Sequence, residues 1–550
     1  MNKFNKLHLA IIMGLILTGC GSESNNRVDS SGQELVDPDE SAPLQYINLS
    51  GMGFNDFNDI SYEQSYAYQL NLSNNEFNSY NGIDKMFDGI QLILMDNNIQ
   101  KIDIGGLSGL PNLSVIRGNS FSGGICDLAS LSKLSILDLV QYSDPSGSLD
   151  YNDLSCLSSF DSLKALGLIG ANIEPNTSIR FLNNSNIKNL NFYLLPFSDV
   201  TYDTLDNGNM EYIDLSGSSS EEVVSLNSLS NSADSLVFLS GKGIRFSNPS
   251  ALADFTAIEH LTLTLKEDYR QNQYGDWYAP NVDYSNIFEN MTNLSHLDIS
   301  GSSDHGLPSV ITDLSSLENK PLFSLNIENT FMTINYYETE ALATLTELQV
   351  LNLSSARIED TSFIENMEKL EYLYLENTYF NGNYSFLKNL NKLKVISISI
   401  NDYQIADEFD TSLLEGKEDL ENVSIYVSNS NPDRNIFNLD WIDSTPNLKH
   451  LDVNYLINQS NISKLSELEF DYLNLSTSNI TNFNLLDEIN ISKNINDKGE
   501  IVLPQGADYN EFGYYNGNII KASYSGEFCQ SWSKGEIKVT APDPINSYCN

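Results

Sequence analysis

Two consecutive stretches of the chain, Leu348-Gln-Val-Leu351-Asn-Leu353 and Leu370-Glu-Tyr-Leu373-Tyr-Leu375, carry the same leucine pattern 22 residues apart. Each is followed five residues later by another apolar residue, Ile358 in the first and Phe380 in the second. The Leu-x-Leu alternation predicts a short strand whose leucines point to one side and whose intervening residues point to the other. Because one such strand cannot bury its leucines alone, the pattern predicts units that stack.

The same frame recurs along most of the sequence, in roughly eighteen units between about Leu44 and Ile491. Stacking these units edge to edge would pair their strands in a parallel sheet and align the leucines in a continuous core. We therefore predict a curved solenoid with short parallel strands on its concave face and an irregular or short helical convex side. Further clear copies are Leu70-Asn-Leu72, Leu92-Ile-Leu94, Leu134 to Leu139, Leu163 to Leu168, Ile213-Asp-Leu215, Leu261-Thr-Leu263, Leu294 to Ile299, Leu448 to Val453 and Leu468 to Leu475.

This repeat resembles the leucine-rich-repeat family, and the 22-residue units with a short convex side are most similar to the bacterial internalin type. The resemblance covers more than three quarters of the chain and implies the fold. It says little about function, because solenoids of this family bind unrelated partners. The chain departs from the internalin type in units stretched to 26 to 29 residues and in having no evident helical cap before Leu44.

Polar residues three positions after the last strand leucine predict a second feature of the stack. Asn75 and Asn97 stand where repeats of this kind turn the backbone, so we expect a buried amide to satisfy free main-chain groups of the neighbouring coil. Thr330, Ala356 and Thr378 occupy the same place in later units. We expect the amide ladder to be incomplete there.

The first residues predict export. Lys3 and Lys6 precede an apolar run from Leu7 to Leu17 that ends in Thr18-Gly19-Cys20. The run is about half of the ~20 residues that a bilayer span needs, so we interpret residues 1–19 as a signal peptide. The end of this segment resembles the lipobox of bacterial lipoproteins, which implies that Cys20 carries lipid and anchors the mature protein without a transmembrane helix. The alternative is a secreted protein whose Cys20 lies near the cleavage site by chance.

Residues 20–43 follow as the lipidated cysteine and a tether. This stretch is rich in Ser, Asn, Asp and Glu and nearly free of large apolar side chains, so it cannot bury enough surface to offset chain entropy. By the sorting rule of the family, Gly21 and Ser22, with no Asp directly after the cysteine, imply the outer membrane. We expect the protein to be lipid-anchored there, with its body at the cell surface.

The charge of the chain excludes one class of partner. The formal net charge is −45, and removing Lys3 and Lys6 with the signal leaves 27 − 74 = −47. The field of such a chain repels polyanions, so bulk electrostatics would not bind nucleic acid or anionic lipid. It favours cationic partners or, as the simpler explanation, serves solubility.

Four cysteines remain after Cys20, an even number in an exported chain, so two disulfides are expected. Cys126 and Cys156 each precede a strand in adjacent units, where equivalent positions lie about 5 Å apart. Two buried free thiols are the alternative. Cys529 and Cys549 lie in residues 494–550, beyond the solenoid at 44–493. We expect that segment to be a disulfide-closed cap over the last coil, with apolar cover from Tyr514, Tyr515 and Trp532. A small ligand module is the alternative.

Several side chains on the predicted concave face are candidates for partner binding. His260, His296 and His450 each precede the first leucine of a strand, so they should point away from the core. His260 and His296 belong to consecutive units, with Asp298 two residues further on, but we favour polar contacts over a metal site. The whole predicted contact surface comprises His260, Thr262, His296, Asp298, Tyr374 and Asp452, with Asp214, Asn326 and Asn352 beside them.

A second candidate is the insertion at Lys266–Asn286, which is rich in aromatic residues. Exposed Tyr and Trp side chains give large contact area at low entropy cost, so they are typical binding anchors. Alternatively, the loop folds back and buries its rings on the flank. A further tryptophan, Trp441, is expected in a loop before Leu448. The candidate anchors in the insertion are Tyr274, Trp277 and Tyr278, between Tyr269 and Tyr284.

The sequence contains no motif that predicts catalysis, and no cofactor is expected. There is no Walker loop, Gly-x-Ser-x-Gly elbow, His-Glu-x-x-His or Cys-x-x-Cys pattern. Ser303, Asp304 and His305 are consecutive, whereas the members of a catalytic triad converge from separated positions. The sequence therefore predicts a protein that binds a protein or glycan partner in adhesion or recognition. The alternative is a structural scaffold of the outer membrane that faces the periplasm.

Overall fold

The computed structural model describes most of the repeat region and part of the C-terminal segment. The described residues are 45–55, 57, 67–77, 80, 82–83, 92–95, 102–119, 121–140, 155–170, 177–178, 186–193, 200–201, 208–216, 223–242, 245–263, 270–271, 277–278, 286–301, 313–330, 333–334, 336–380, 384–400, 409–427, 438–453, 459–476, 483–493, 498–503, 526–540 and 549.

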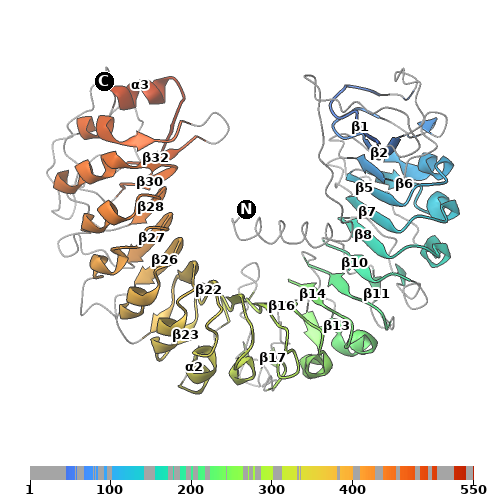
Figure 1. Ribbon diagram of the computed structural model, residues 1–550, viewed down its shortest axis with the longest axis horizontal. Helices are drawn as coiled ribbons and strands as arrows, with labels where there is room; N and C mark the ends of the chain where they lie inside the picture. The colour runs from blue at the N-terminus through green and yellow to red at the C-terminus, as the bar shows by residue number, and fades with distance from the viewer. Residues whose placement is uncertain are drawn as a thin grey trace.

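The described coils form a horseshoe with one long sheet along its inner side (Figure 1). Within the described residues this sheet has 20 strands, and each pairs in parallel with the next one along the chain. The strands are β1 (Gln45–Asn48), β2 (Ala67–Asn71), β3 (Leu92–Met95), β5 (Val115–Asn119), β7 (Ile136–Val140), β8 (Ala165–Ile169), β10 (Asn189–Asn191), β12 (Tyr212–Asp214), β14 (Phe238–Gly241), β16 (His260–Leu263), β19 (His296–Asp298), β20 (Ser324–Asn326), β22 (Val350–Asn352), β24 (Tyr372–Leu375), β26 (Val395–Ile400), β27 (Asn422–Val427), β28 (His450–Val453), β30 (Tyr472–Asn474), β32 (Glu500–Val502) and β33 (Lys538–Thr540).

The strand leucines form the core, as the repeat predicts. The register aligns Leu351 with Leu373 and Leu373 with Ile396, and all three side chains are fully buried. Side chains between them face the concave side, since β24 alternates partly exposed and buried residues. The chain is therefore a leucine-rich-repeat solenoid.

Short helices and short strand pairs form the convex side. Helices are about 10 Å wide, whereas parallel strands lie about 4.8 Å apart, so stacking such coils curves the solenoid with the strands inside. The helices are η3 (Ile104–Gly109), η4 (Cys126–Ser130), η5 (Ser155–Ser159), η8 (Leu226–Ser232), η9 (Pro249–Asp254), η11 (Ser315–Leu317), α2 (Tyr336–Leu342), η12 (Ser362–Asn366), η13 (Ser385–Asn389), η15 (Thr411–Leu414), η16 (Asp440–Ser444), η17 (Gln459–Glu467), η18 (Phe483–Glu488) and α3 (Glu527–Ser533).

Small strands pair outside the main sheet in the same coils. One further pair, β17 (Arg270–Gln271) with β18 (Trp277–Tyr278), is antiparallel and belongs to the insertion. The parallel groups are β4 (Ile102–Asp103) with β6 (Phe121–Gly123), β9 (Thr177–Ser178) with β11 (Val200–Thr201), β13 (Val223–Ser225) with β15 (Arg245–Ser247), β21 (Thr333–Ile334) with β23 (Arg357–Ile358) and β25 (Tyr379–Phe380), and β29 (Glu469–Phe470) with β31 (Asn490–Ile491).

Asn75 has the buried, bridging position predicted for it. Its Nδ2 donates to the Leu49 carbonyl of the preceding coil at 2.7 Å, and its Oδ1 accepts from the Phe54 amide at 3.2 Å. Thr378 keeps one bond to the preceding coil, from its Oγ1 to the Leu353 carbonyl at 2.9 Å, whereas Thr330 Oγ1 donates within its own coil, to the Ile327 carbonyl at 2.8 Å. Asn97 lies outside the described residues.

Both expected disulfides are present. Cys126 and Cys156 join the adjacent coils that contain η4 and η5, with Cα atoms 5.4 Å apart. Cys529 of α3 is joined to Cys549, with Cα atoms 5.6 Å apart. The first disulfide lies on the convex side, directly behind strands β7 and β8.

The C-terminal segment also continues the sheet. Strand β32 pairs with β30, and β33 pairs with β32, so two strands beyond residue 493 extend the concave face. Trp532 of α3 packs partly buried against the core, while Tyr514 and Tyr515 lie outside the described residues. No helix in the described part of the chain is long and apolar enough to cross a membrane.

The position of Trp441 corrects one expectation. The sequence places it in a loop, whereas the structure places it on η16 with a side chain only 1 % exposed. The reason is the coil geometry, since η16 turns this face toward the core.

Candidate functional site

A row of five rings crosses the concave face in the middle of the horseshoe. Tyr212 stacks on Phe238 with ring centroids 4.3 Å apart, and Phe238 lies 5.8 Å from His260. His260 stacks on His296 at 4.2 Å, and His296 lies 5.2 Å from Phe323. Phe238 is buried and the other four rings are partly exposed. We call these five residues the ring row.

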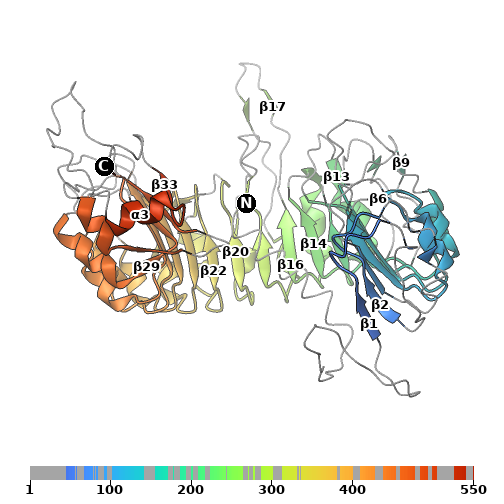
Figure 2. The ribbon, with the colours of Figure 1, turned by 90° about the horizontal axis from the view of Figure 1, so that it is seen from above.

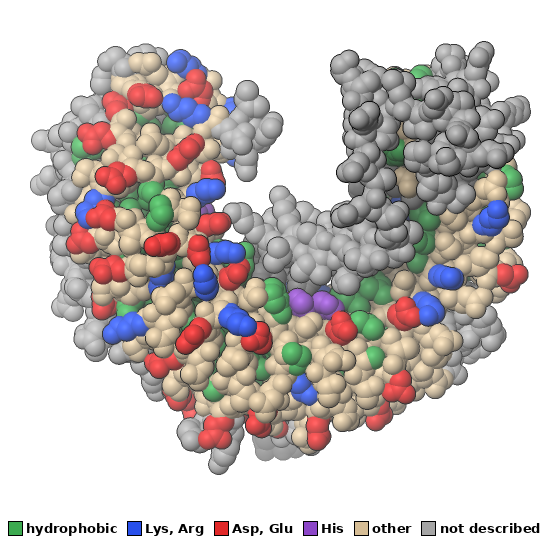
Figure 3. Space-filling view, in the orientation of Figure 1, with side chains coloured by type: hydrophobic (Ala, Val, Ile, Leu, Met, Phe, Trp, Pro, Cys, Tyr) green, Lys and Arg blue, Asp and Glu red, His purple; other side chains and the backbone are tan. Residues whose placement is uncertain are grey.

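The sheet register explains why the ring row is continuous. His260 pairs with His296 and with Phe238, which in turn pairs with Tyr212, so these four rings lie one strand step apart. Phe323 directly precedes Ser324, the register partner of His296. Parallel strands lie about 4.8 Å apart, which is close to the stacking distance of aromatic rings. Figure 3 shows histidine side chains at the inner rim of the horseshoe. The sequence analysis found the two histidines but not their three aromatic neighbours, although Tyr212 and Phe238 also directly precede a strand's first core residue.

The smaller predicted contact residues lie deeper than expected. Thr262 is 9 % exposed and Asp298 is 7 % exposed, and each lies between register partners on both neighbouring strands. Asp298 Oδ1 accepts from the Ser300 amide at 3.0 Å and from Ser300 Oγ at 2.6 Å, and Oδ2 lies 3.3 Å from Lys242 Nζ. Burial alone would raise the pKa of Asp298, but Lys242 and the bonds from Ser300 and Asn326 outweigh it and hold the pKa below its usual value. Asp298 thus stabilises the concave face through its own hydrogen bonds and is not exposed enough to be a main contact for a partner.

Tyr374 and Asp452 lie outside the ring row, toward the C-terminal end. Burial raises the pKa of Tyr374 to about 12, with smaller contributions from Tyr372 and Glu376. Asp452 accepts a short hydrogen bond from Tyr426 Oη and another from Asn474 Nδ2 at 2.7 Å. The structure therefore does not gather all the predicted contact residues in one place. His450, in turn, stacks on Tyr472 at 4.5 Å as a separate pair of rings.

Strands β5 to β12 hold a polar group that the sequence analysis missed. Arg117, Asp138 and Gly167 are paired in register across three strands, and Tyr212 lies two strands further along. Arg117 Nε, Asp138 Oδ1 and Tyr212 Oη are buried without a hydrogen-bond partner among the described residues. Burial raises the pKa of Asp138, and Arg117 partly opposes this. Gly167 between two core leucines is the sequence signal that could have found it, because the Asp138 carboxylate occupies the space beside it: a Cβ at Gly167 would collide with Asp138 Oδ1.

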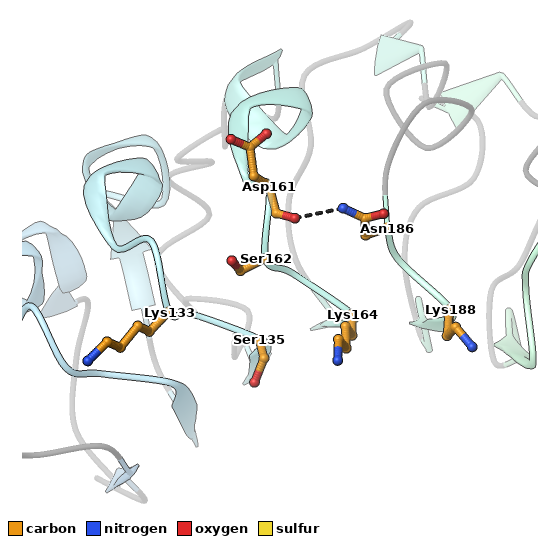
Figure 4. A pocket seen from close by; sticks show the side chains of 7 residues that line it. All are labelled: Lys133, Ser135, Asp161, Ser162, Lys164, Asn186 and Lys188. Atoms are coloured by element: carbon orange, nitrogen blue, oxygen red, sulfur yellow. Dashed lines mark hydrogen bonds between the residues drawn. The ribbon is translucent and has the colours of Figure 1, made fainter.

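A cavity of about 440 Å³ lies on the flank where the chain enters strands β7, β8 and β10 (Figure 4). Lys133, Lys164 and Lys188 line it, and the Asp161 carboxylate points away from their ammonium groups in Figure 4. The rest of the lining is Ser135, Ser162 and Asn186.

Two short strands of the insertion are among the described residues. Its strands β17 and β18 pair at Gln271 with Trp277 and at Arg270 with Tyr278, and Figure 2 shows β17 standing away from the row of coils. Tyr274 lies outside the described residues, so its binding role stays a prediction. Ser303 to His305 also lie outside them. Within the described part of the chain, no group of three or more His, Cys, Asp or Glu side chains is placed to hold a metal ion.

The chain is similar to several solved structures at low sequence identity. An internalin from Listeria monocytogenes is 18 % identical over 70 % of this chain and 86 % of its own, with a TM-score of 0.37. A leucine-rich-repeat protein of Leptospira interrogans is 16 % identical over 64 % of this chain and 90 % of its own, with a TM-score of 0.47. A plant peptide hormone receptor, solved in complex with its ligand RGF2, is 14 % identical over 88 % and 81 %, with a TM-score of 0.45.

No family model matches the chain, and no curated protein matches it. The class therefore rests on the repeat and on the parallel register of the strands. What the protein does must be argued from its own surface.

Proposed function

We propose that this chain is a recognition protein that binds a partner protein through the concave sheet, with the ring row as the anchor. The ring row is the observation that carries this proposal. Tyr, Phe and His rings at the centre of a face offer apolar area that is already held in place by stacking, so little entropy is lost on binding. The four partly exposed rings leave that area open to a partner.

The dimensions of the ring row suit an extended segment of polypeptide. From Tyr212 to Phe323 the row crosses four strand steps, which is about 19 Å at 4.8 Å a step. An extended chain advances about 3.3 Å per residue, so about six residues cover the row. The strongly acidic chain, at a net charge of −45, favours segments that carry basic residues around the apolar anchor.

The test selects binders from a library of random 12-residue peptides displayed on phage, using the full chain as the target. Peptides that bind the proposed site should lose at least tenfold in affinity with His296→Ala or Phe323→Ala. Tyr472→Ala is the matched control, because it removes a ring from the separate His450–Tyr472 pair on the same sheet. Equal loss with all three variants, or none with the first two, would overturn the ring row as anchor. The full chain is also tested on a glycan array. Binding to glycans there, with no binder selected from the peptide library, would overturn the protein-partner class.

We further propose that Cys20 is lipidated and that the protein is an outer-membrane lipoprotein exposed at the cell surface. The lipobox-like ending of the apolar run supports the anchor, and Gly21 and Ser22 support the outer membrane. Expression of the full chain in a bacterium fed an alkyne fatty acid should label it, and Cys20→Ser should remove the label. A protein that stays unlabelled contradicts the anchor.

Protease treatment of intact cells separates the surface protein from the periplasmic scaffold, which is the second candidate. A surface-exposed solenoid should be cleaved in intact cells, whereas a periplasmic one should be cleaved only after the outer membrane is opened. Protection from protease in intact cells would contradict a surface-exposed adhesion protein and would favour the periplasmic scaffold.

A further inference from the structure

We propose that the cavity on the flank of strands β7, β8 and β10 binds a sulfated polysaccharide through Lys133, Lys164 and Lys188, at a site separate from the concave sheet. The chain has 29 Lys and Arg against 74 Asp and Glu, yet three lysines line this one cavity. The observation that carries the proposal is that these three cations come from three consecutive coils.

The solenoid aligns the lysines. The Lys164 amide donates to the Ser135 carbonyl, and the Lys188 amide donates to the Lys164 carbonyl, both at 2.8 Å. Lys164 and Lys188 thus hold equivalent places in neighbouring coils, and Lys133 comes from the coil before them. At about 4.8 Å a coil, the three side chains start from points spread over about 10 Å.

The ammonium groups are available to a ligand. The Lys164 side chain has no hydrogen bond or ion pair to any other described residue. Lys133 Nζ donates to Asn112 Oδ1 at 2.6 Å, and Lys188 Nζ lies 2.5 Å from Glu211 Oε1, in a pair whose side chains are both nearly half exposed. Exposed contacts of this kind contribute little free energy, so a ligand with several anions can replace them.

The spacing favours a chain of anions over a single one. Lys133 Nζ donates to Asn112 on the coil before the cavity, and Lys188 Nζ contacts Glu211 on the coil after it, so the two outer amines point apart. An ammonium–oxyanion bond requires about 2.8 Å between N and O, so one small oxyanion does not contact all three amines in this arrangement. A polymer with a negative group on successive units can. The lysines therefore indicate repeated sulfates or carboxylates on one ligand.

The polar lining favours sugar hydroxyls between those anions. Ser162 Oγ donates to the Ser132 carbonyl and Ser135 Oγ donates to the Ser114 carbonyl, so both oxygens still accept. Asn186 Nδ2 donates to the Asp161 carbonyl, which leaves Oδ1 as an acceptor. Three free acceptors beside three cations match a ligand that carries both hydroxyl donors and anions. Sulfated polysaccharides carry both.

The net charge of the chain does not prevent this binding at physiological salt. The Debye length is about 8 Å at 0.15 M, so acidic residues further away are largely screened while lysines in contact are not. The Asp161 carboxylate, which lines the cavity, points away from the ammonium groups (Figure 4). Local attraction therefore exceeds the long-range repulsion that excludes polyanions from the rest of the surface.

The experiment titrates the full chain with dextran sulfate at 0.15 M NaCl and follows heat by calorimetry. Uncharged dextran, inorganic sulfate, poly-glutamate and single-stranded DNA are the comparison probes. The variants are Lys164→Met and the triple change of Lys133, Lys164 and Lys188 to Met. Lys369→Met is the matched control. Lys369 is exposed and forms an ion pair with Glu347 outside the cavity, so this substitution removes the same charge without changing the cavity.

Dextran sulfate should bind, with about three- to fivefold lower affinity in Lys164→Met, as expected for an exposed charge contact. The triple variant should lose at least tenfold, and Lys369→Met should stay within twofold. His296→Ala should leave dextran sulfate binding unchanged, which separates this site from the ring row. Equal losses in Lys369→Met and Lys164→Met would overturn the proposal. So would poly-glutamate or DNA binding as tightly as dextran sulfate, or inorganic sulfate binding as tightly per sulfate group.

Discussion

Two aspartates occupy the same place in the repeat and have opposite surroundings. Asp138 lies between the core leucines of β7, and Asp452 lies between the core residues of β28. The next strand presents Gly167 to Asp138 but Asn474 to Asp452. Asp452 accepts from Asn474 and from Tyr426 on the preceding strand, while Asp138 Oδ1 has no partner among the described residues.

This difference teaches that the neighbouring coil decides what a repeat position does. A side chain on the concave face reaches only the one or two nearest strands, as Lys242 reaches Asp298 across two strand steps, so its partner must come from a nearby coil. Tyr426 is one step from Asp452 and donates to it, whereas Tyr212 is three strand steps from Asp138 and its Oη stays unpaired. Asp452 therefore stabilises the coils around β28, which we call the C-terminal arm. Asp138 costs free energy in the coils around β7, which we call the N-terminal arm.

The largest expected effect is the contribution of the Cys126–Cys156 disulfide to the stability of the N-terminal arm. Replacing Cys126 and Cys156 by serine removes a bridge that closes 30 residues across the coils behind Asp138. Such a loop contributes about 3 to 4 kcal/mol in the chain-entropy model. Hydrogen exchange should show faster opening of β7 and β8 with little change in β24 to β28, because coils of a repeat array unfold with their neighbours. Uniform loss of protection along the array would contradict this.

The next effect concerns a buried cation in the C-terminal arm. Lys417 is 1 % exposed, its Nζ donates to the Leu387 and Leu390 carbonyls at 2.7 and 3.1 Å, and burial lowers its pKa to about 8. The unfolded chain binds this proton up to about pH 10.4, so the contribution of Lys417 to stability rises between pH 8 and 10.4, by about 3 kcal/mol.

Chemical denaturation of the protein and of Lys417→Met at several pH values measures this contribution as the difference between the two. The free energy of unfolding of the wild type should rise relative to that of the variant as the pH rises from 8 to 10.4. A difference that is constant with pH, or that falls, would show that the Lys417 amine remains charged in the fold.

The comparison of the two aspartates is tested directly by Asp452→Ala and Asp138→Ala. The first leaves Tyr426 and Asn474 without their acceptor and should lower the free energy of unfolding by about 2 kcal/mol. The second removes a carboxylate whose Oδ1 has no partner, so it should cost nothing or stabilise the fold. Denaturant midpoints measured side by side at pH 7 check this, and equal losses would remove the contrast.

The smallest effect is the pH dependence of Asp138. Because burial raises its folded pKa above the unfolded value of about 3.9, the folded state holds the proton longer. Its contribution to stability is fully present below the unfolded pKa and is lost as the pH rises through the folded pKa. The free energy of unfolding of Asp138→Asn should therefore rise relative to that of the wild type as the pH rises from 3.9. Parallel stability curves for the variant and the wild type would contradict the buried carboxylate.

Much of the fold could be predicted because each coil repeats a local rule. The Leu-x-Leu alternation determined the strands and the core, and the position of His260 and His296 before a strand leucine predicted that they are neighbours. The bridging position of Asn75 and the Cys126–Cys156 disulfide followed from equivalent positions in stacked coils, and the Cys529–Cys549 disulfide followed from the even number of cysteines. These predictions hold because they depend on register, which the leucines fix.

Predictions about exposure were weaker. Thr262 and Asp298 face the concave side as expected, yet they are nearly buried, with register partners on the strands at both sides. Trp441 was expected in a loop and lies in the core. A local sequence pattern does not show which side chains the adjacent strands present, because those strands lie 20 to 40 residues away in the sequence.

The sequence by itself determined that the chain is a leucine-rich-repeat solenoid, because a leucine period reports directly which residues share a core. It also determined which residues face the concave side. Only the tertiary structure decided what those residues form together: five rings in one row, an aspartate over a glycine, and three lysines around one cavity. The physical reason is that each of these features joins side chains from several coils, and their contacts depend on the curvature of the stack and the identity of the next coil.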